Sequence, residues 1–331
     1  MQTKQKSRLA FTLVELLIVI AIIGVLATMI TAASVAAMHY VRIGIVKMEM
    51  SQIELALESY NREFGEYPPD FFDDVALVRH FKKRWPRFPL TGANPPAIAA
   101  AIRTAIYDVY ETIDGDIDYD DVKACQLGSL AFWLGGFPDK DGRFRGLGAN
   151  PQDPFDVLGS DGKIDREKLD NQSFMELNLG KNIFLVDYGG GKKAFALVNN
   201  AGSGRFVPYV YFRGQSDGGP LAYYDNTPTP SIIKSITFVG YAEPDWPELG
   251  VAVPYGESGD YNATLANSTV VWNNPTTYQL IHPGLDGIFG VAGTNDYRSL
   301  NTADPFNKIG QRDMDNIVNF GDGTTIKSLL P

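Results

Sequence analysis

The sequence of 331 residues has little of the chemistry used by many enzymes and by disulfide-rich exported proteins. It contains one cysteine, Cys125, so no disulfide can form within the chain. Its three histidines are His39, His80 and His282, and none begins a His-Glu-x-x-His zinc motif. A Cys-x-x-Cys pair is impossible with a single cysteine. We therefore predict that the protein is not an enzyme.

Charge is absent from a long stretch near the N-terminus. Residues 16–38 contain no charged side chain, and only threonine and serine interrupt their apolar character. About 20 such residues suffice to span a bilayer. Proline is absent from residues 11–64, so nothing there forbids a single helix of about 80 Å at 1.5 Å per residue.

Basic side chains precede this apolar run, and one acid lies at its start. Lys4, Lys6 and Arg8 mark the cytoplasmic side of a membrane helix, because positive charge is retained there. A charge at the centre of a membrane helix costs roughly 2.5–3.5 kcal/mol. Glu15 therefore has a specific role, unless its side chain only extends to the lipid headgroups.

The segment Phe11-Thr12-Leu13-Val14-Glu15, between the basic leader and the apolar run, resembles the processing site of type IV pilins and type II secretion pseudopilins. In that family a prepilin peptidase cuts before the phenylalanine and methylates the new amino terminus. The resemblance implies a cut between Ala10 and Phe11. The family usually has glycine before the cut, where this chain has Ala10.

The resemblance also suggests a role for Glu15. A neighbouring subunit could place its Phe11 amine beside this carboxylate, and such a pair in low dielectric would fix the axial register between subunits. Two other interpretations of the N-terminus remain open. A secretory signal peptide could be cleaved near residues 34–37, although its apolar core is usually 7–15 residues long. An uncleaved membrane anchor fits the length but gives Glu15 no role.

The remaining chain is acidic. The net charge is −10, and removal of residues 1–10 with their three basic side chains leaves −13. Such a surface argues against nucleic acid and anionic lipid as partners. We predict a single-pass inner membrane protein with a cytoplasmic leader and an external, periplasmic head that later enters a filament. A basic cluster at residues 79–87 is interpreted as a solvated face, with lipid headgroups or an acidic partner as alternatives.

The sequence predicts the α+β class, with a long N-terminal helical spine packed on a C-terminal antiparallel sheet. The spine has an apolar half (residues 11–40) and an amphipathic half (residues 41–66). The amphipathic half is indicated by apolar residues at three- and four-residue steps, namely Met50, Ile53, Leu57, Tyr60 and Phe64. Residues 1–10 are the leader, residues 67–180 a helical and loop insertion, and residues 181–331 a β-rich head.

Within these regions, capping and breaking residues suggest individual elements. Helices are expected at residues 75–85, 95–110 and 121–134. Strands are expected at residues 183–186, 194–198, 209–212, 232–239 and 269–272. Residues 214–230 and 243–262 are rich in Gly, Pro and Asp and are expected to be loops.

Residues 278–290 and 313–320 resemble the calcium loop of the major pseudopilin of type II secretion. The resemblance implies calcium held by Asp286, Asp315 and Asn316, with Asp313 or Asp296 as a substitute ligand and carbonyls near Leu280 and Pro283. Calcium takes six to eight oxygen ligands in irregular geometry. The alternative is that these residues only form Asx turns. The Asp-Gly segments at residues 139–142 and 161–165 are interpreted as turns.

These features predict a prepilin-like structural subunit. It would be processed by prepilin peptidase and assembled with other pilin-like subunits into a type II secretion pseudopilus or a type IV pilus-like filament. The alternative is a minor tip subunit that acts as an adhesin or substrate-binding module through the large middle region. Counting copies per filament would distinguish the two.

Overall fold

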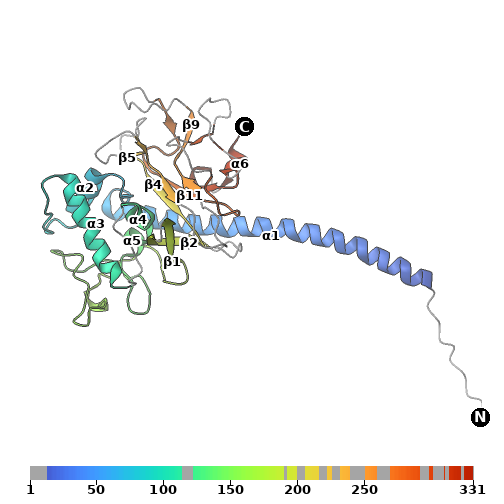
Figure 1. Ribbon diagram of the computed structural model, residues 1–331, viewed down its shortest axis with the longest axis horizontal. Helices are drawn as coiled ribbons and strands as arrows, with labels where there is room; N and C mark the ends of the chain where they lie inside the picture. Colours follow the sequence, from blue (N-terminus) through green and yellow to red (C-terminus); the bar gives the residue numbers. More distant parts are fainter. Residues whose placement is uncertain are drawn as a thin grey trace, which may run out of the picture. The chain divides into compact units, whose positions relative to one another are not determined.

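The computed structural model describes most of the chain beyond the leader. The described residues are 13–113, 122–189, 192–199, 206–215, 222–225, 232–238, 250–258, 269–290, 298–300, 309, 313–321 and 324–330. The chain forms two compact units, Met1–Gly44 and Ile45–Pro331, and we call the second the head unit. Helix α1, Leu13–Phe64, contributes residues to both (Figure 1).

The amphipathic half of α1 packs as the sequence predicts. Met50, Ile53, Leu57 and Tyr60 are each at most 1% exposed, which places them in the core of the head unit. The helix ends at Phe64 because Gly65 adopts a positive φ of 71° and its N–H donates to the carbonyl of Asn61 at 2.7 Å.

Two capped helices follow α1 in the chain. Helix α2, Asp74–Arg84, begins after Asp73, whose side chain accepts hydrogen bonds from the N–H groups of Val75 and Ala76. Helix α3, Pro95–Glu111, begins after Asn94, whose side chain accepts from the N–H of Ala97. Both helices were predicted, α2 from its apolar residues and α3 from Asn94 and Pro95, and both are confirmed.

The helix predicted at residues 121–134 is wrong in one respect, because the structure divides it in two. Helix α4 covers Val122–Leu127 and helix α5 covers Ser129–Gly135, while residue 121 lies outside the described part. Gly128 separates them and its carbonyl accepts the first hydrogen bond of α5, from the N–H of Phe132 at 3.0 Å. Glycine is a poor helix former, which favours a new start at this point. The 3-10 helix η1, Arg166–Lys168, follows later in the insertion.

Antiparallel pairing dominates the strands of the head unit. Strands β1 (Ile183–Gly189) and β2 (Lys192–Asn199) form the predicted hairpin, and β3 (Val207–Pro208) extends it. A four-stranded sheet has the order β14-β13-β11-β4. Its strands are Thr324–Thr325, Ile317–Val318, Tyr278–His282 and Val210–Arg213. The predicted α+β class is therefore confirmed.

Shorter strands correct several sequence-based boundaries. The single strand predicted at residues 232–239 is two, β6 (Ile232–Ile233) and β7 (Ile236–Phe238), and residue 239 lies outside the described part. The expected loops contain β5 (Tyr224–Asp225), β8 (Gly250–Ala252) and β9 (Tyr255–Ser258). The remaining elements are β10 (Val271–Trp272), β12 (Arg298–Ser299), the 3-10 helix η4 (Asn319–Gly321) and helix α6 (Ile326–Leu329). Strand β12 pairs with β9 in parallel.

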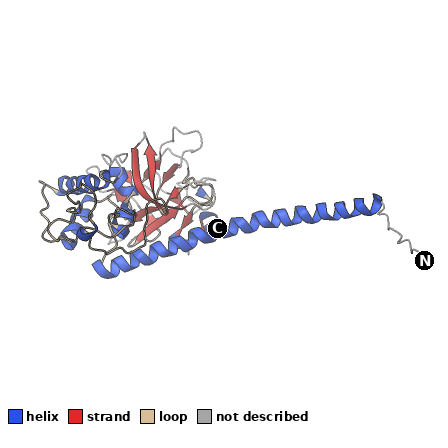
Figure 2. Cartoon of the chain, turned by 90° about the horizontal axis from the view of Figure 1, so that it is seen from below, coloured by secondary structure: helices blue, strands red, loops and turns tan. Residues whose placement is uncertain are grey.

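An aromatic cluster joins the helices of the insertion to α1 within the head unit. Trp133 of α5 lies at its centre, with ring centroids 6.2 Å from Tyr60, 5.7 Å from Phe71 and 5.5 Å from Phe81. Figure 2 shows the short helices gathered beside the strands in this unit. Each of these rings is at most 2% exposed, so the cluster holds the insertion on the same core as α1.

Candidate functional site

The N-terminal part of α1 exposes an almost continuous apolar surface. Its large hydrophobic side chains from Leu13 to Val41 are 45–78% exposed. Among the described residues, this helix alone is long and apolar enough to cross a membrane, with a mean hydropathy of 2.8 over its most apolar 18 residues. None of that window is buried inside the protein, which is unlike the core helix of a soluble domain.

The hydroxyl groups in this apolar stretch bond within the helix. Thr28 donates to the carbonyl of Val25 at 2.7 Å. Thr31 and Ser34 donate to carbonyls four residues earlier, each at 2.8 Å. These bonds satisfy polar groups that would otherwise be costly in lipid. The exposed surface is therefore compatible with hydrocarbon despite its polar residues.

Glu15 lies in the first turn of α1. A carboxylate at this position interacts favourably with the positive end of the helix dipole. Ala10 and Phe11, between which the sequence predicts cleavage, lie outside the described residues. The cleavage prediction and the pairing of Glu15 with a neighbouring Phe11 amine therefore stay predictions.

The C-terminal loop brings two of the four predicted metal ligands into one turn. Asp315 Oδ2 accepts hydrogen bonds from the backbone N–H of Leu285 at 2.8 Å and of Asp286 at 3.0 Å. Asp286 is exposed, and its Oδ1 accepts from the N–H of Ile288 at 2.8 Å. These are the bonds of an Asx-stabilised loop, and Asp315 fixes it from a distant part of the chain.

The other two predicted ligands lie in a buried polar group around Tyr255. Asn316 Nδ2 donates to the Tyr255 hydroxyl at 2.8 Å, and that hydroxyl lies 3.4 Å from Asp313 Oδ1. Asp313 and Asn316 are each 1% exposed, and Asn316 Oδ1 is buried without a hydrogen-bond partner. Asp313 and Asn316 thus both contact the Tyr255 hydroxyl inside the protein.

In the described part of the chain, no group of three or more acidic, histidine or cysteine side chains is arranged to hold a metal ion. Asp296 lies outside the described residues. A calcium ion at this loop would need backbone carbonyls or ligands from the undescribed residues 291–297 and 301–308. Calcium therefore stays a prediction.

His282, at the end of β11, faces the interior beside this loop. It is fully buried, its ring centroid lies 4.9 Å from that of Tyr209, and its Nδ1 accepts from the N–H of Gly284 at 3.1 Å. Burial lowers the pKa of His282 to about 3, so its ring is neutral at physiological pH. A buried neutral ring serves packing here and provides no charge to the loop.

The two Asp-Gly segments form turns, as the sequence predicts. Asp139 Oδ1 accepts from the N–H groups of Asp141 and Arg143, and Asp139 Oδ2 accepts from Arg145 Nε at 3.0 Å. In the second segment, Asp161 Oδ1 accepts from the N–H of Lys163 at 3.1 Å. The side-chain oxygens of Asp139 are therefore engaged within the protein.

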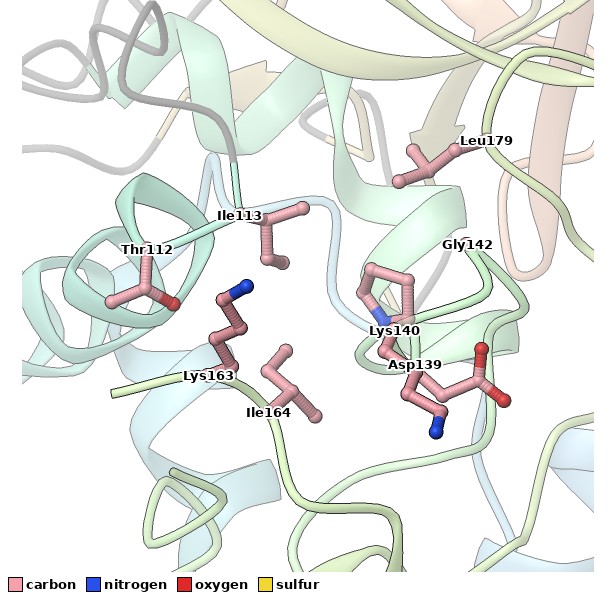
Figure 3. A pocket seen from close by; sticks show the side chains of 9 residues that line it. Thr112, Ile113, Asp139, Lys140, Gly142, Lys163, Ile164 and Leu179 are labelled. Carbon is pink, nitrogen blue, oxygen red and sulfur yellow. The ribbon is translucent and has the colours of Figure 1, made fainter. Parts of the chain in front are cut away.

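The first of these turns borders a cleft of about 340 Å³ (Figure 3). Figure 3 shows the Lys163 amine in the cleft near Thr112 and Ile113, while the carboxylate of Asp139 points away from that amine. Residues 114–121, which follow Ile113 and include five aspartates, lie outside the described part. We therefore assign no ligand to this cleft.

A polar network at the end of α1 is not evident from the sequence. The Glu66 carboxylate lies 3.0 Å from His80 Nδ1 and accepts from Arg213 Nη2 at 2.9 Å. On the other side of the imidazole, the Tyr60 hydroxyl lies 2.6 Å from His80 Nε2. Arg84 lies against the same group, with its guanidinium 4.5 Å from the Phe64 ring centroid. Since the Arg84 side chain is only 6% exposed, residues 79–87 are not wholly the solvated face that was expected.

The charge states in this network follow from its contacts. Burial lowers the pKa of His80, so the ring is neutral and donates from Nδ1 to Glu66. Partial burial acts to raise the pKa of Glu66, but hydrogen bonds from His80 and Arg213 lower it to about 2. Glu66 is therefore ionised, and His80 Nε2 accepts the proton of Tyr60.

A buried ion pair extends this network to the strands. Lys234 Nζ lies 2.8 Å from Asp70 Oδ2, and both residues are 2% exposed. Asp70 Oδ2 also accepts from the N–H of Arg213, and Lys234 donates to the carbonyl of Arg213 at 2.6 Å. Lys234 lies between β6 and β7, which explains why the predicted strand is broken there. The hydrogen bond from Arg213 of β4 to Asp70 ties the segment after α1 to the four-stranded sheet.

One sequence pattern associated with hydrolases also occurs here. Residues 214–218 read Gly-Gln-Ser-Asp-Gly, the spacing of a nucleophile elbow, and Ser216 lies outside the described residues. That elbow joins a strand to a helix. Here the preceding strand is β4 and the next described element is strand β5. A side chain at Gly214 would collide with the carbonyl of Pro275, so its glycine is explained by packing.

Comparison with known proteins identifies the N-terminal segment. Residues 5–31 match a family model described as the prokaryotic N-terminal methylation motif. No curated protein and no solved structure matched the chain. The match covers residues 5–10 of the basic leader, the predicted cleavage position, Glu15 and the first part of the exposed apolar helix. The chain thus carries the prokaryotic N-terminal methylation motif, which supports the resemblance to type IV pilin-like proteins.

Proposed function

We propose that this protein is a non-catalytic, prepilin-like structural subunit that assembles into a pseudopilus or a type IV pilus-like filament. The observation that carries the proposal is an exposed apolar helix whose first part lies within a methylation motif. The apolar side chains of such a helix need lipid around them before assembly and protein neighbours after it, because their exposure to water is unfavourable. Prepilin peptidase would cut before Phe11, and other pilin-like subunits would then replace lipid around α1.

Glu15 would set the register between subunits. Glu15 carries the only side-chain charge within residues 11–38, and pairing with the Phe11 amine of a neighbour would offset the desolvation of both charges. A shifted neighbour would not offer this pairing. The pairing therefore selects one axial offset between copies.

Substitution of Glu15 tests this proposal directly. With Glu15→Gln in the full chain, we expect processing to continue and filament yield to fall by at least about tenfold, which corresponds to 1.4 kcal/mol. Glu63→Gln is the matched control, because Glu63 is exposed near the other end of the same helix. Immunoblots of sheared filaments against membrane fractions measure the yield. Equal yields for Glu15→Gln and wild type would remove the register role.

The alternative role as a minor tip subunit differs in copy number. A shaft subunit occurs many times along each filament, whereas a tip adhesin or substrate-binding module occurs once. Quantitative mass spectrometry of purified filaments measures this ratio. A single copy per filament would replace the shaft proposal with the tip proposal.

A further inference from the structure

One stretch of the insertion contains no acidic residue. From Val75 to Tyr107 the sequence has neither Asp nor Glu, although the whole chain has 39 such residues. The same stretch carries six of the 29 basic residues, and without these six the net charge of −10 would be −16. Positive charge is therefore gathered in one part of an otherwise acidic protein. Such an asymmetry indicates an anionic partner for this part.

Four of these basic residues form an exposed surface. They are Arg79, Lys82 and Lys83 of α2 and Arg87 just beyond it, and we call this surface the basic face. The side chains of Arg79 and Lys83 are 56% and 50% exposed, and Lys82 and Arg87 are exposed as well. Steps of three and four residues place Arg79, Lys82 and Lys83 on one side of the helix. The other side of α2 is buried in the head unit, for example through Leu77.

The protein itself compensates only part of this positive charge. The Glu66 carboxylate lies 3.5 Å from Arg79 Nη2 and 3.9 Å from Lys83 Nζ, near the outer limit for an ion pair. Glu66 also accepts a shorter hydrogen bond from Arg213, at 2.9 Å. One negative charge therefore lies among three positive charges. The basic face keeps a net positive charge that an external anion can neutralise.

An anionic lipid surface does not fit the position of the basic face. Lys83 lies beside Glu66, which follows the end of α1 closely, and the Arg84 guanidinium lies 4.5 Å from the Phe64 ring centroid. The basic face is therefore at the Phe64 end of α1. Residues 45–64 of that helix span about 30 Å at 1.5 Å per residue, whereas charges in water are screened within about 8–10 Å. Lipid headgroups around the apolar run, which ends before residue 45, are too far along the helix to attract this face.

Nucleic acid and folded protein also fit this face poorly. Single-stranded nucleic acid needs aromatic rings on which its bases stack, but Phe81 and Trp85 are 0% and 6% exposed. Duplex DNA would bring dense negative charge against the acidic remainder of the protein. A folded protein partner usually buries an apolar centre, yet Val75 is the only large hydrophobic side chain of α2 that is exposed. The face therefore suits a partner that is recognised by its charges alone.

We propose that the basic face binds the carboxylate groups of an acidic polysaccharide outside the cell, which rests on the export of the head that the proposed function requires. Residues three and four apart on a helix lie about 5–6 Å from each other, so a polymer with carboxylates on successive sugar rings can meet several cations at once. The guanidinium groups of Arg79 and Arg87 can hold a carboxylate through two hydrogen bonds, while Lys82 and Lys83 act as point charges. Each exposed pair is weak, and binding arises from their number.

The test measures binding of the full chain in detergent to immobilised alginate, a polymer of uronic acids. We expect binding that weakens as the salt concentration rises, because salt screens exposed charges. The triple variant Arg79→Gln, Lys82→Gln, Arg87→Gln should lose at least about tenfold in affinity. Lys83 stays unchanged because its amine lies close to Glu66. The assay uses unassembled protein, so a failure of binding is distinguished from a failure of filament assembly.

A matched control removes the same charge elsewhere in the head unit. The variant Lys140→Gln, Arg166→Gln, Lys181→Gln changes three exposed basic residues outside the basic face and should bind alginate within about twofold of wild type. Both triple variants should keep the melting temperature of wild type, because every changed side chain is exposed. The proposal is overturned if wild type does not bind alginate or if the two triple variants lose equal affinity. Tighter binding of wild type to duplex DNA or to anionic lipid vesicles than to alginate would overturn it as well.

Discussion

The two parts of helix α1 are both α-helical, but their side chains are buried to different extents. In residues 13–44 the large apolar side chains are almost all exposed, so this part depends on surroundings outside the chain. In residues 45–64 one side is buried by the head and the other is exposed. Helix formation alone therefore does not distinguish these parts. The two parts differ in the surroundings of their side chains.

The second part of α1 is held by contacts that the first part lacks among the described residues. The segment after Phe64 enters the network of Glu66, His80 and Arg213, and then the ion pair of Asp70 with Lys234. Loss of a contact there should destabilise the head. Loss of an apolar group from residues 13–44 should instead affect only insertion or assembly.

The largest effect on stability is expected from the buried ion pair. Lys234→Met leaves the Asp70 carboxylate buried without its counter-ion, which should lower the free energy of unfolding by about 3–5 kcal/mol. Lys168→Met is the matched control, because the Lys168–Asp156 pair has a similar distance of 2.7 Å but is exposed. The control should lose far less stability, because an exposed ion pair is screened by water. Denaturant unfolding of the full chain in detergent measures both, and equal losses would contradict the role of burial.

A smaller effect distinguishes the two parts of α1 themselves. Leu57 is fully buried, so Leu57→Ala should lower the free energy of unfolding of the head by about 2–5 kcal/mol. Leu26 is 52% exposed, and Leu26→Ala should leave that free energy unchanged within about 0.5 kcal/mol. Thermal unfolding in the same detergent compares them. A marked loss for Leu26→Ala would mean that the first part is also packed on the head.

The head should also lose stability in mild acid. The pKa of His282 is about 3 in the folded state and about 6.5 when unfolded, so below pH 6.5 the unfolded chain binds a proton that the folded chain does not. Its contribution is fully present above pH 6.5 and is lost progressively toward pH 3, by up to about 1.4 kcal/mol per pH unit. His80 acts in the same direction, because burial lowers its pKa too.

His282→Asn isolates this contribution, since asparagine retains an acceptor for the N–H of Gly284 without a titrating ring. The variant should show a weaker decrease of melting temperature between pH 7 and pH 5 than wild type. Identical pH profiles for the two proteins would show that His282 does not control this range.

The smallest expected effect concerns the predicted calcium. If calcium binds the C-terminal loop, EDTA should lower the melting temperature of the full chain, and Asp286→Ala should abolish that shift. Asp161→Ala is the control, because Asp161 caps a separate turn. If EDTA does not change the melting temperature of the wild-type protein, the calcium prediction is wrong.

Local signals in the sequence were sufficient for many helix boundaries and for the hairpin. Gly65 ends α1 through its positive φ, and Asn94 caps α3 through its side chain. Such features depend on residues close in the chain, so the sequence alone reveals them.

Elements that depend on distant partners were missed or misplaced. Lys234 breaks the predicted strand because Asp70, far away in the chain, attracts its amine. Gly250 opens β8 in a region expected to be a loop, where a side chain would collide with the Gly290 carbonyl. The hydrogen bond between Asn316 and Tyr255 likewise joins residues far apart in the chain. None of these long-range contacts can be predicted from a local sequence pattern.

The central claim is that prepilin peptidase removes residues 1–10, so that the apolar part of α1 lies at the start of the mature chain. Intact mass spectrometry of the protein from cells with prepilin peptidase tests it most directly. The account predicts a mature chain that starts at methylated Phe11. A chain that starts at Met1, or after cleavage near residue 37, would contradict it.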